Sequence, residues 1–160
     1  MPISLELFVM LVLANGAPVV AAKVLRNYWA SPVDGGRLWF DGRPVLGASK
    51  TWRGLVAGAL SCALFSWWVE LGFLFGLLFG SLALSGDLLS SFAKRRWGLE
   101  PSARARGVDQ IPEAALPLIL AVFWLPLSVW VALLLVALFA LSNVIFSPIL
   151  FRLGIRNQPY

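Results

Sequence analysis

Long apolar segments alternate with polar segments along this chain. The apolar segments cover residues 5–25, 54–70, 73–92 and 111–153. A helix of about 20 apolar residues spans the hydrocarbon core of a bilayer, so each of the first three segments predicts one membrane span. The fourth is too long for one span, and Pro126 divides it into spans at 111–125 and 127–151. The pattern therefore predicts one all-α domain, residues 1–160, with five transmembrane helices.

Composition supports a membrane protein. Hydrophobic residues make up 59% of the 160 residues and charged residues only 13%, whereas soluble domains contain about 25% charged residues. The first apolar segment lacks a basic region before it and a small-residue cleavage site after it. It is therefore predicted to be a span and not a removable signal peptide.

The cations predict the orientation of the spans. Residues 23–53 contain six Lys and Arg, residues 94–106 contain five and residues 152–156 contain two, which accounts for all 13. The five-span arrangement puts all of these segments on one side. By the positive-inside rule, the N-terminus is outside, the C-terminus is inside and both polar loops are cytoplasmic. We expect a multi-pass protein of the cell membrane.

The residue inventory restricts the chemistry. The chain has no histidine and one cysteine, Cys62, which lies in an apolar segment. Histidine bases, the usual zinc sites, cysteine metal clusters and disulfide frameworks are therefore excluded. A metal ion would have to be a hard cation bound by oxygen, such as Mg²⁺.

Asp87 lies within the third apolar segment, where an ionisable group is costly and often functional. In a continuous helix Asp87, Ser90, Ser91 and Lys94 share one face. Two interpretations stay open. The face belongs to a functional site, or Asp87 is a buried partner of a lysine such as Lys94, followed by an ordinary basic loop.

The first polar loop contains the elements of a phosphate site. Gly42 and Gly47 allow close backbone approach, and Lys50 and Thr51 come just before a predicted helix start, which favours anions. The spacing differs from a P-loop, because two residues separate Gly47 from Lys50.

Two aspartates, Asp87 and Asp109, accompany the cations of the two loops. A basic cytoplasmic face alone indicates attraction to anionic lipids. Carboxylates among cations are also what a metal-bound polyphosphate requires. Without histidine or a reactive cysteine, phosphoryl-type transfer is the chemistry left open.

Four motifs occur in order along the chain. They are Asn15 with Pro18; Asp41-Gly42-Arg43-Pro44 with Gly47, Lys50-Thr51 and Gly54; Gly86-Asp87-Leu88 with Ser91 and Lys94-Arg95-Arg96; and Val108-Asp109-Gln110. This order resembles the CTP-dependent phosphatidate cytidylyltransferases, and more closely their small archaeal branch, the CDP-archaeol synthases. The bacterial enzymes continue into a P-G-H-G-G-x-x-D-R segment, where this chain has ARARGVDQ.

The resemblance implies a reaction of CTP with a membrane lipid phosphate, either phosphatidate-like or an isoprenoid ether, that yields a CDP-lipid and pyrophosphate. It implies Mg²⁺ as cofactor, bound by Asp87 and Asp109, and no nucleic-acid partner. It also implies roles for three groups of residues. Lys94, Arg95 and Arg96 neutralise the triphosphate, with Ser91 in the same motif; Lys50 and Thr51 contact phosphate in a loop shaped by Asp41, Gly42 and Gly47; Asn15 and Gln110 are nucleotide or supporting contacts.

Other functions would also use some of these residues. A small anion transporter lined by Asp87 and the basic loops is the main alternative, although no matching polar site occurs on the outer side. A CDP-alcohol phosphotransferase needs further aspartates after a D-G pair, which Asp34-Gly35 lacks. Asn15 could also be a packing group beside a helix kink at Pro18. Small-residue stripes in the second and third spans suit packing within one chain or in a homodimer.

Overall fold

The structure is a computed structural model that describes the backbone of residues 2–99 and 110–152 and the side chains of residues 2–99 and 110–145. The described residues form five helices: α1 (Ile3–Leu25), α2 (Trp52–Trp68), α3 (Phe73–Arg96), α4 (Gln110–Trp124) and α5 (Val129–Arg152). Their only β-structure is two isolated bridges in the loop between α1 and α2. The predicted all-α class is confirmed.

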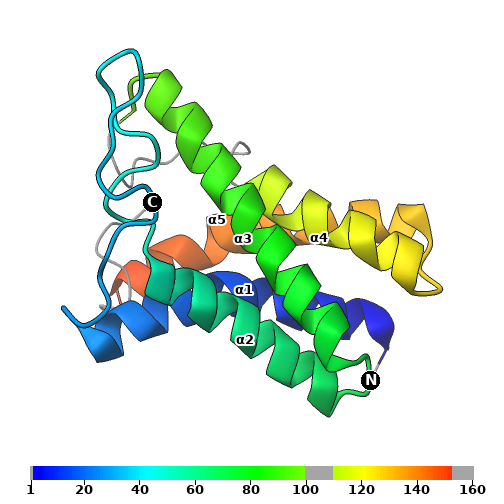
Figure 1. The fold of residues 1–160 in the computed structure, drawn as a ribbon. Coiled ribbons are helices and arrows are strands. Elements are labelled where there is room, and N and C mark those ends of the chain that lie inside the picture. Colours follow the sequence, from blue (N-terminus) through cyan, green and yellow to red (C-terminus); the bar gives the residue numbers. More distant parts are fainter. Residues whose placement is uncertain (1, 100–109, 153–160) are drawn as a thin grey trace.

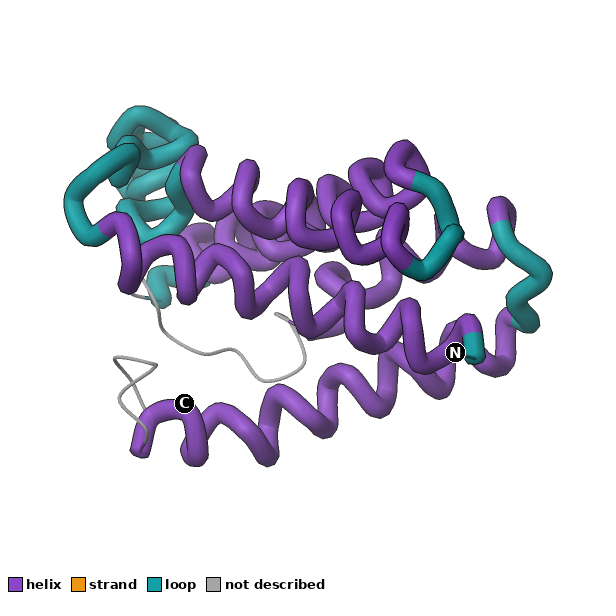
Figure 2. The backbone as a smooth tube through the Cα atoms, turned by 90° about the horizontal axis from the view of Figure 1, so that it is seen from below, coloured by secondary structure: helices purple, strands orange, loops and turns teal. Residues whose placement is uncertain are grey.

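The helices form a bundle in which α3 crosses the others steeply (Figure 1). Helix α3 packs against α1, α2 and α4, and α5 packs against α4 and α1. The loop of residues 26–51 and the carboxyl ends of α3 and α5 lie at one end of the bundle. The short connections at 69–72 and 125–128 lie at the other (Figures 1 and 2). The described cations of the loop and of the end of α3 therefore gather at one end.

The helix bounds lie close to the predicted spans. Helix α3 continues past Phe92 to Arg96, so Lys94 is helical, as the shared face with Asp87 requires. The break at Pro126 separates α4 from α5, as predicted. Helix α2 begins at Trp52 and ends at Trp68, two residues before the predicted bounds at both ends.

Small residues bring α2 and α3 into backbone contact. A Cβ added at Gly76 would lie 2.4 Å from Ser66 Cβ and 2.5 Å from Cys62 O. One added at Gly80 would lie 2.9 Å from Cys62 Cβ. On the α1 side, a Cβ at Gly58 would lie 2.7 Å from Ala14 O. The stripes predicted from sequence are therefore used within one chain.

Helix α3 meets α4 at Gly86, next to Asp87. A Cβ there would lie 2.3 Å from Pro112 O and 2.7 Å from Glu113 N. Only glycine permits this approach, which sets the first turn of α4 beside the aspartate.

The core is apolar, and so is much of the outer surface. Leu7 and Leu11 of α1, Phe79 of α3 and Phe139 of α5 are almost fully buried. Outward-facing side chains include Phe123 and Trp130, which are 87% and 80% exposed. Among the described residues α1 and α3 are long and apolar enough to cross a membrane. Exposed apolar surface of this extent is typical of a protein solvated by lipid.

Replacing Gly86 tests the contact between α3 and α4. Gly86→Ala is expected to lower stability by about 1–3 kcal/mol, because the added methyl group overlaps the α4 backbone. Gly16→Ala in α1 is the matched control, since a Cβ there has no neighbour within 4 Å and alanine favours a helix. Thermal unfolding in detergent measures both. Equal melting temperatures for the two variants would contradict the contact.

Candidate active site

An ion pair joins the Lys50 motif of the first loop to the Asp87 motif of α3. Lys50 Nζ lies 2.6 Å from Asp87 Oδ1 and 2.5 Å from Asp87 Oδ2. Lys50 belongs to the loop before α2, and Asp87 to the interior of α3, 37 residues further along. Both side chains are 21% exposed. The partner that the structure shows for Asp87 is therefore Lys50, which comes from another element than the Lys94 suggested by the spacing. Lys94 is itself buried, on the same face of α3.

Asp34 organises the loop that carries Lys50. Its Oδ1 accepts the N–H of Gly36 at 2.9 Å, and its Oδ2 accepts those of Leu46 at 2.9 Å and Gly47 at 3.0 Å. Burial raises the pKa of Asp34, but the three backbone donors outweigh this effect and hold it below the usual value. Gly47 has φ +99°, which a residue with a side chain rarely adopts. This role of Asp34 was not predicted from the sequence, although the turn residues Asp34-Gly35-Gly36 are a signal for it.

The segment just before α2 is bonded to residues 32–33 at the start of the same loop. Val33 N donates to Lys50 O at 2.8 Å, and Pro32 and Thr51 form an isolated bridge. Thr51 is the N-cap residue of α2, without a side-chain capping bond. Lys50 is therefore fixed at its backbone, and its side chain is directed at α3.

A buried polar face continues along α3 beyond Asp87. Ser90, Ser91, Lys94 and Arg95 are each at most 7% exposed. Ser90 Oγ donates to Asp87 O at 2.9 Å. Two hydroxyls and two cations thus extend from the Lys50–Asp87 pair to the end of the helix. This is the face predicted from the spacing of Asp87, Ser90, Ser91 and Lys94.

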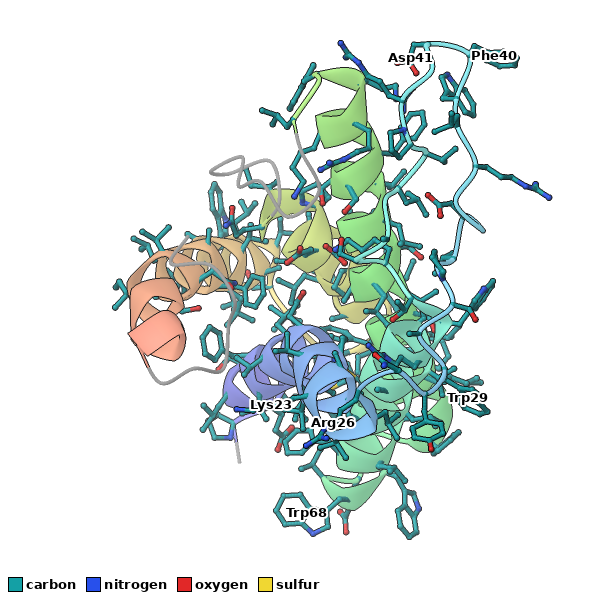
Figure 3. The ribbon with its side chains drawn as sticks, turned by 90° about the vertical axis from the view of Figure 1, so that its left-hand side faces the viewer. Lys23, Arg26, Trp29, Phe40, Asp41 and Trp68 are labelled. Atoms are coloured by element: carbon teal, nitrogen blue, oxygen red, sulfur yellow. The ribbon has the colours of Figure 1, made fainter. Side chains whose placement is uncertain are left out.

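Arg96 attaches the first loop to α3. It donates to Asp41 Oδ1 and, at 2.6 Å, to Pro44 O. Arg43 Nη1 in return donates to Arg96 O at 2.7 Å. Slight desolvation raises the pKa of Asp41, but the Arg43 N–H and Arg96 more than offset it and lower the pKa below its usual value. Asp41 lies at the end of α3, where Figure 3 labels it.

Helix α4 contributes two buried polar residues. Gln110 and Glu113, in its first turn, are 5% and 8% exposed. Their position follows from the backbone contact at Gly86. Gln110 was predicted at the site, whereas Glu113 was not. The sequence feature that could have indicated Glu113 is its position as an acidic residue at the start of an apolar segment.

The remaining predicted site residues lie apart or outside the described residues. Asn15 Nδ2 donates to Leu11 O, 3.1 Å away in its own helix, so its amide bonds locally. Gly42 has φ +75° and forms the hairpin turn beside Asp41. Asp109, the second predicted metal ligand, lies outside the described residues.

Comparison with known proteins identifies the family. Residues 7–160 match the family described as CarS-like CDP-archaeol synthase. The chain belongs to the CDP-archaeol synthase family. The resemblance expected from the four motifs is thereby confirmed, and membership gives no support to the transporter alternative.

Individual relatives agree. A CDP-archaeol synthase of Methanosphaerula palustris is 34% identical over 153 residues, which cover 81% of this chain and 90% of the relative. One from Hyperthermus butylicus is 40% identical over 104 residues, 61% of this chain and 59% of the relative. A solved intramembrane enzyme for archaeal membrane lipid biosynthesis superposes with a TM-score of 0.72 at 28% identity, covering 88% of this chain and 90% of that one. The present chain, as a member of this family with apolar helices, is therefore a membrane protein.

The loop depends on the ionised form of Asp34, which makes it sensitive to acid. The folded-state pKa is lowered, so the stabilisation is present above the unfolded pKa of about 4 and is lost as pH falls through the folded value. We expect the amides of Leu46 and Gly47 to stay protected from hydrogen exchange, corrected for intrinsic rates, down to about pH 4.

The matched variants are Asp34→Ala and Asp41→Ala, measured at pH 7. Asp34→Ala should speed exchange at both amides by about tenfold or more, the equivalent of one lost hydrogen bond to a charged acceptor. Asp41→Ala should accelerate exchange at these two amides much less, since Asp41 accepts the N–H of Arg43 and bonds to Arg96 instead. Equal acceleration in both variants would show that Asp34 has no special role.

Proposed function

We propose that this protein is a CTP-dependent cytidylyltransferase that converts an archaeol-type lipid phosphate and CTP to a CDP-lipid and pyrophosphate. Its relatives are named for synthesis of CDP-archaeol. The observation that carries the proposal is the Lys50–Asp87 pair. It joins the motif of the first loop to the motif of α3 at one end of the bundle. A carboxylate, hydroxyls and cations meet there, as a bound triphosphate requires.

The reaction is a displacement at the α-phosphorus of CTP. An oxygen of the lipid phosphate forms the new P–O bond, the bond from the α-phosphorus to the bridging oxygen breaks, and pyrophosphate leaves with the electron pair. The attacking phosphate monoester is already ionised near neutral pH, so no general base is needed. Lys50, Lys94 and Arg95 supply positive charge toward the triphosphate, which offsets the charge that grows on the leaving pyrophosphate.

Mg²⁺ fits the proposed site at Asp87. Both oxygens of this carboxylate face the Lys50 ammonium, a cation whose place Mg²⁺ would take. Among the described residues no three carboxylate, histidine or cysteine side chains are grouped to hold a metal. The remaining ligands would come from Asp109, phosphate oxygens and water. Bound Mg²⁺ would screen the triphosphate and polarise the reacting phosphoryl group.

We further propose five membrane passes with the site on the cytoplasmic side. The described cations of the loop and of the end of α3 lie at one end of the bundle, where CTP from the cytosol and the lipid phosphate would meet (Figure 1). Thr51 and Trp52 start α2 at this end, and Trp67 and Trp68 lie exposed at its other end. Aromatic residues at both ends of α2 suit the two membrane interfaces.

Position-specific labels test the reaction. Purified protein is incubated with Mg²⁺ and CTP labelled at either the α- or the γ-phosphorus, together with an archaeol-type phosphate, a diacylglycerol phosphate or the corresponding lipid alcohol. We expect the α-label in the lipid and the γ-label in pyrophosphate, with the archaeol-type phosphate and not with the alcohol. Transfer of the γ-label to lipid would indicate a kinase and contradict the proposal.

Two lysine variants are the matched pair for this assay. Lys50→Met should reduce turnover by about 100-fold or more, the usual range for losing a group that stabilises transition-state charge. Lys23→Met removes the same charge from an exposed position at the end of α1 and should retain turnover. An equal loss in both variants would mean that only overall charge matters.

A further inference from the structure

The loop between α1 and α2 contains a small hairpin, residues 37–45. Trp39 N donates to Arg43 O at 2.8 Å and Val45 N to Arg37 O at 3.0 Å, and Leu38 and Pro44 form an isolated bridge. The turn is closed by Gly42, whose N–H donates to Trp39 O at 2.9 Å. Successive side chains of an extended strand point to opposite faces. Leu38 and Trp39 therefore point to opposite faces, and Phe40, at the start of the turn, meets Trp39 edge to face with ring centroids 5.2 Å apart.

The Trp39 side chain attaches the hairpin to α3. Trp39 and Phe92 meet edge to face with ring centroids 5.3 Å apart. The Arg96 guanidinium lies 5.8 Å from the Trp39 centroid and 5.0 Å from that of Phe92. Together with the bond from Arg96 to Asp41, these contacts fix the hairpin relative to the helix. The positions of Leu38 and Phe40, the chain neighbours of Trp39, are therefore also determined.

Leu38 and Phe40 form an apolar surface, here called the hairpin face, that the described residues leave exposed. Phe40 is 97% exposed and Leu38 64%. They border an open cavity of about 720 Å³ whose lining includes Val33, Val45 and Trp52. Viewed from this end of the bundle, Phe40 and Trp29 lie at its perimeter and point away from the helices (Figure 3). Exposing this much aromatic surface to water would cost free energy.

Charge and continuity identify what covers this face. Arg37 lines the same cavity together with Asp34, whose carboxylate accepts backbone N–H groups, and Arg26 lies exposed at the start of the loop. Aromatic rings combined with arginines match the headgroup level of a bilayer with anionic lipids. The exposed apolar surfaces of α1 and α2 begin beside the loop, with Val24 71% and Val56 45% exposed. Lipid around those helices would therefore reach the hairpin without interruption.

We propose that the hairpin face of Leu38 and Phe40, extended by Trp29 and Trp52, is a lipid-binding surface that lies in the headgroup region of an anionic leaflet. The proposal rests on the membrane insertion proposed above. It goes beyond the catalytic function, because it turns a loop predicted to be polar and cytoplasmic into a membrane-contacting element.

This contact would set the depth of the active site. The chain from the hairpin reaches Lys50 within five residues, and Val33 N and Lys50 O join the two sides of the loop. Holding the hairpin in the headgroup region therefore holds Lys50 at the level of a lipid phosphate. The ion pair with Asp87 then lies where a lipid phosphate and a water-soluble nucleotide can both reach it.

Site-directed fluorescence tests the proposal in nanodiscs that contain anionic lipid. The variants Phe40→Cys, Leu60→Cys and Ser49→Cys are each labelled with an environment-sensitive probe such as NBD. Nitroxide lipids labelled at the headgroup or mid-chain and an aqueous ionic quencher then report the depth of each probe. Cys62 is fully buried, so the unsubstituted protein shows the background labelling.

The probe at Phe40 should be quenched several-fold more by headgroup nitroxides than by the aqueous ion. Leu60, exposed midway along α2, should respond to mid-chain nitroxides, and Ser49, exposed beside Lys50, to the aqueous ion. If Leu60 responds to lipid and Phe40 only to the aqueous ion, the hairpin proposal is wrong and membrane insertion stands.

If neither position responds to lipid, the proposed membrane insertion is wrong, and the hairpin proposal, which rests on it, is wrong as well. A second copy of the chain is the rival occupant of this face. Energy transfer between copies labelled at Phe40, in nanodiscs with no lipid quenching at that position, would overturn the proposal in favour of a dimer contact.

Discussion

The contact between Lys50 and Asp87 is the interaction on which the rest of the site depends. A carboxylate inside an apolar helix requires a cation, because an isolated charge there is costly. The cation comes from a loop that precedes α2, so neutralising Asp87 also fixes the loop. Asp34, the Pro32–Thr51 bridge and the Arg96–Asp41 pair then determine the path of the loop around that point.

Small residues let the helices approach one another closely enough to place Asp87 for this contact. Gly76 and Gly80 let α3 cross directly over α2, and Gly86 lets it touch α4. Asp87 therefore lies where three elements meet: the first loop, α3 and the first turn of α4. Ser91, Lys94 and Arg95 follow on the same buried face. Family membership and this arrangement agree, because two of the four motifs that carry the resemblance, those of Lys50 and Asp87, meet here.

Local patterns in the sequence predicted most of the fold. Apolar length gave the five helices, Pro126 the break between the last two, and the four-residue recurrence of Gly54, Gly58, Cys62 and Ser66 the close packing of α2. These features depend on residues near each other along one helix, so their consequences are visible in the sequence. The polar face of α3 was predictable for the same reason.

Long-range contacts were not predictable in this way. Spacing along one helix favoured Lys94 as the partner of Asp87, but Lys50 reaches it from another element. The role of Asp34 depends on N–H groups 12 and 13 residues away. The exposed face of the hairpin could not be read from a segment whose charges and glycines marked it simply as polar. Each depends on how the loop folds back, which no periodicity encodes.

The most direct measurement is turnover per folded molecule in the Asp87→Asn/Lys50→Met double variant, with Glu70→Gln as the control at the opposite end of the bundle. Each single substitution strands one charge and should lower the melting temperature, whereas the double variant removes both charges and should regain stability. The account predicts that the double variant, although stable, turns over CTP at least about 100-fold more slowly than the control. Recovery of turnover together with stability would contradict it, because the pair would then be a structural contact and not part of the catalytic site.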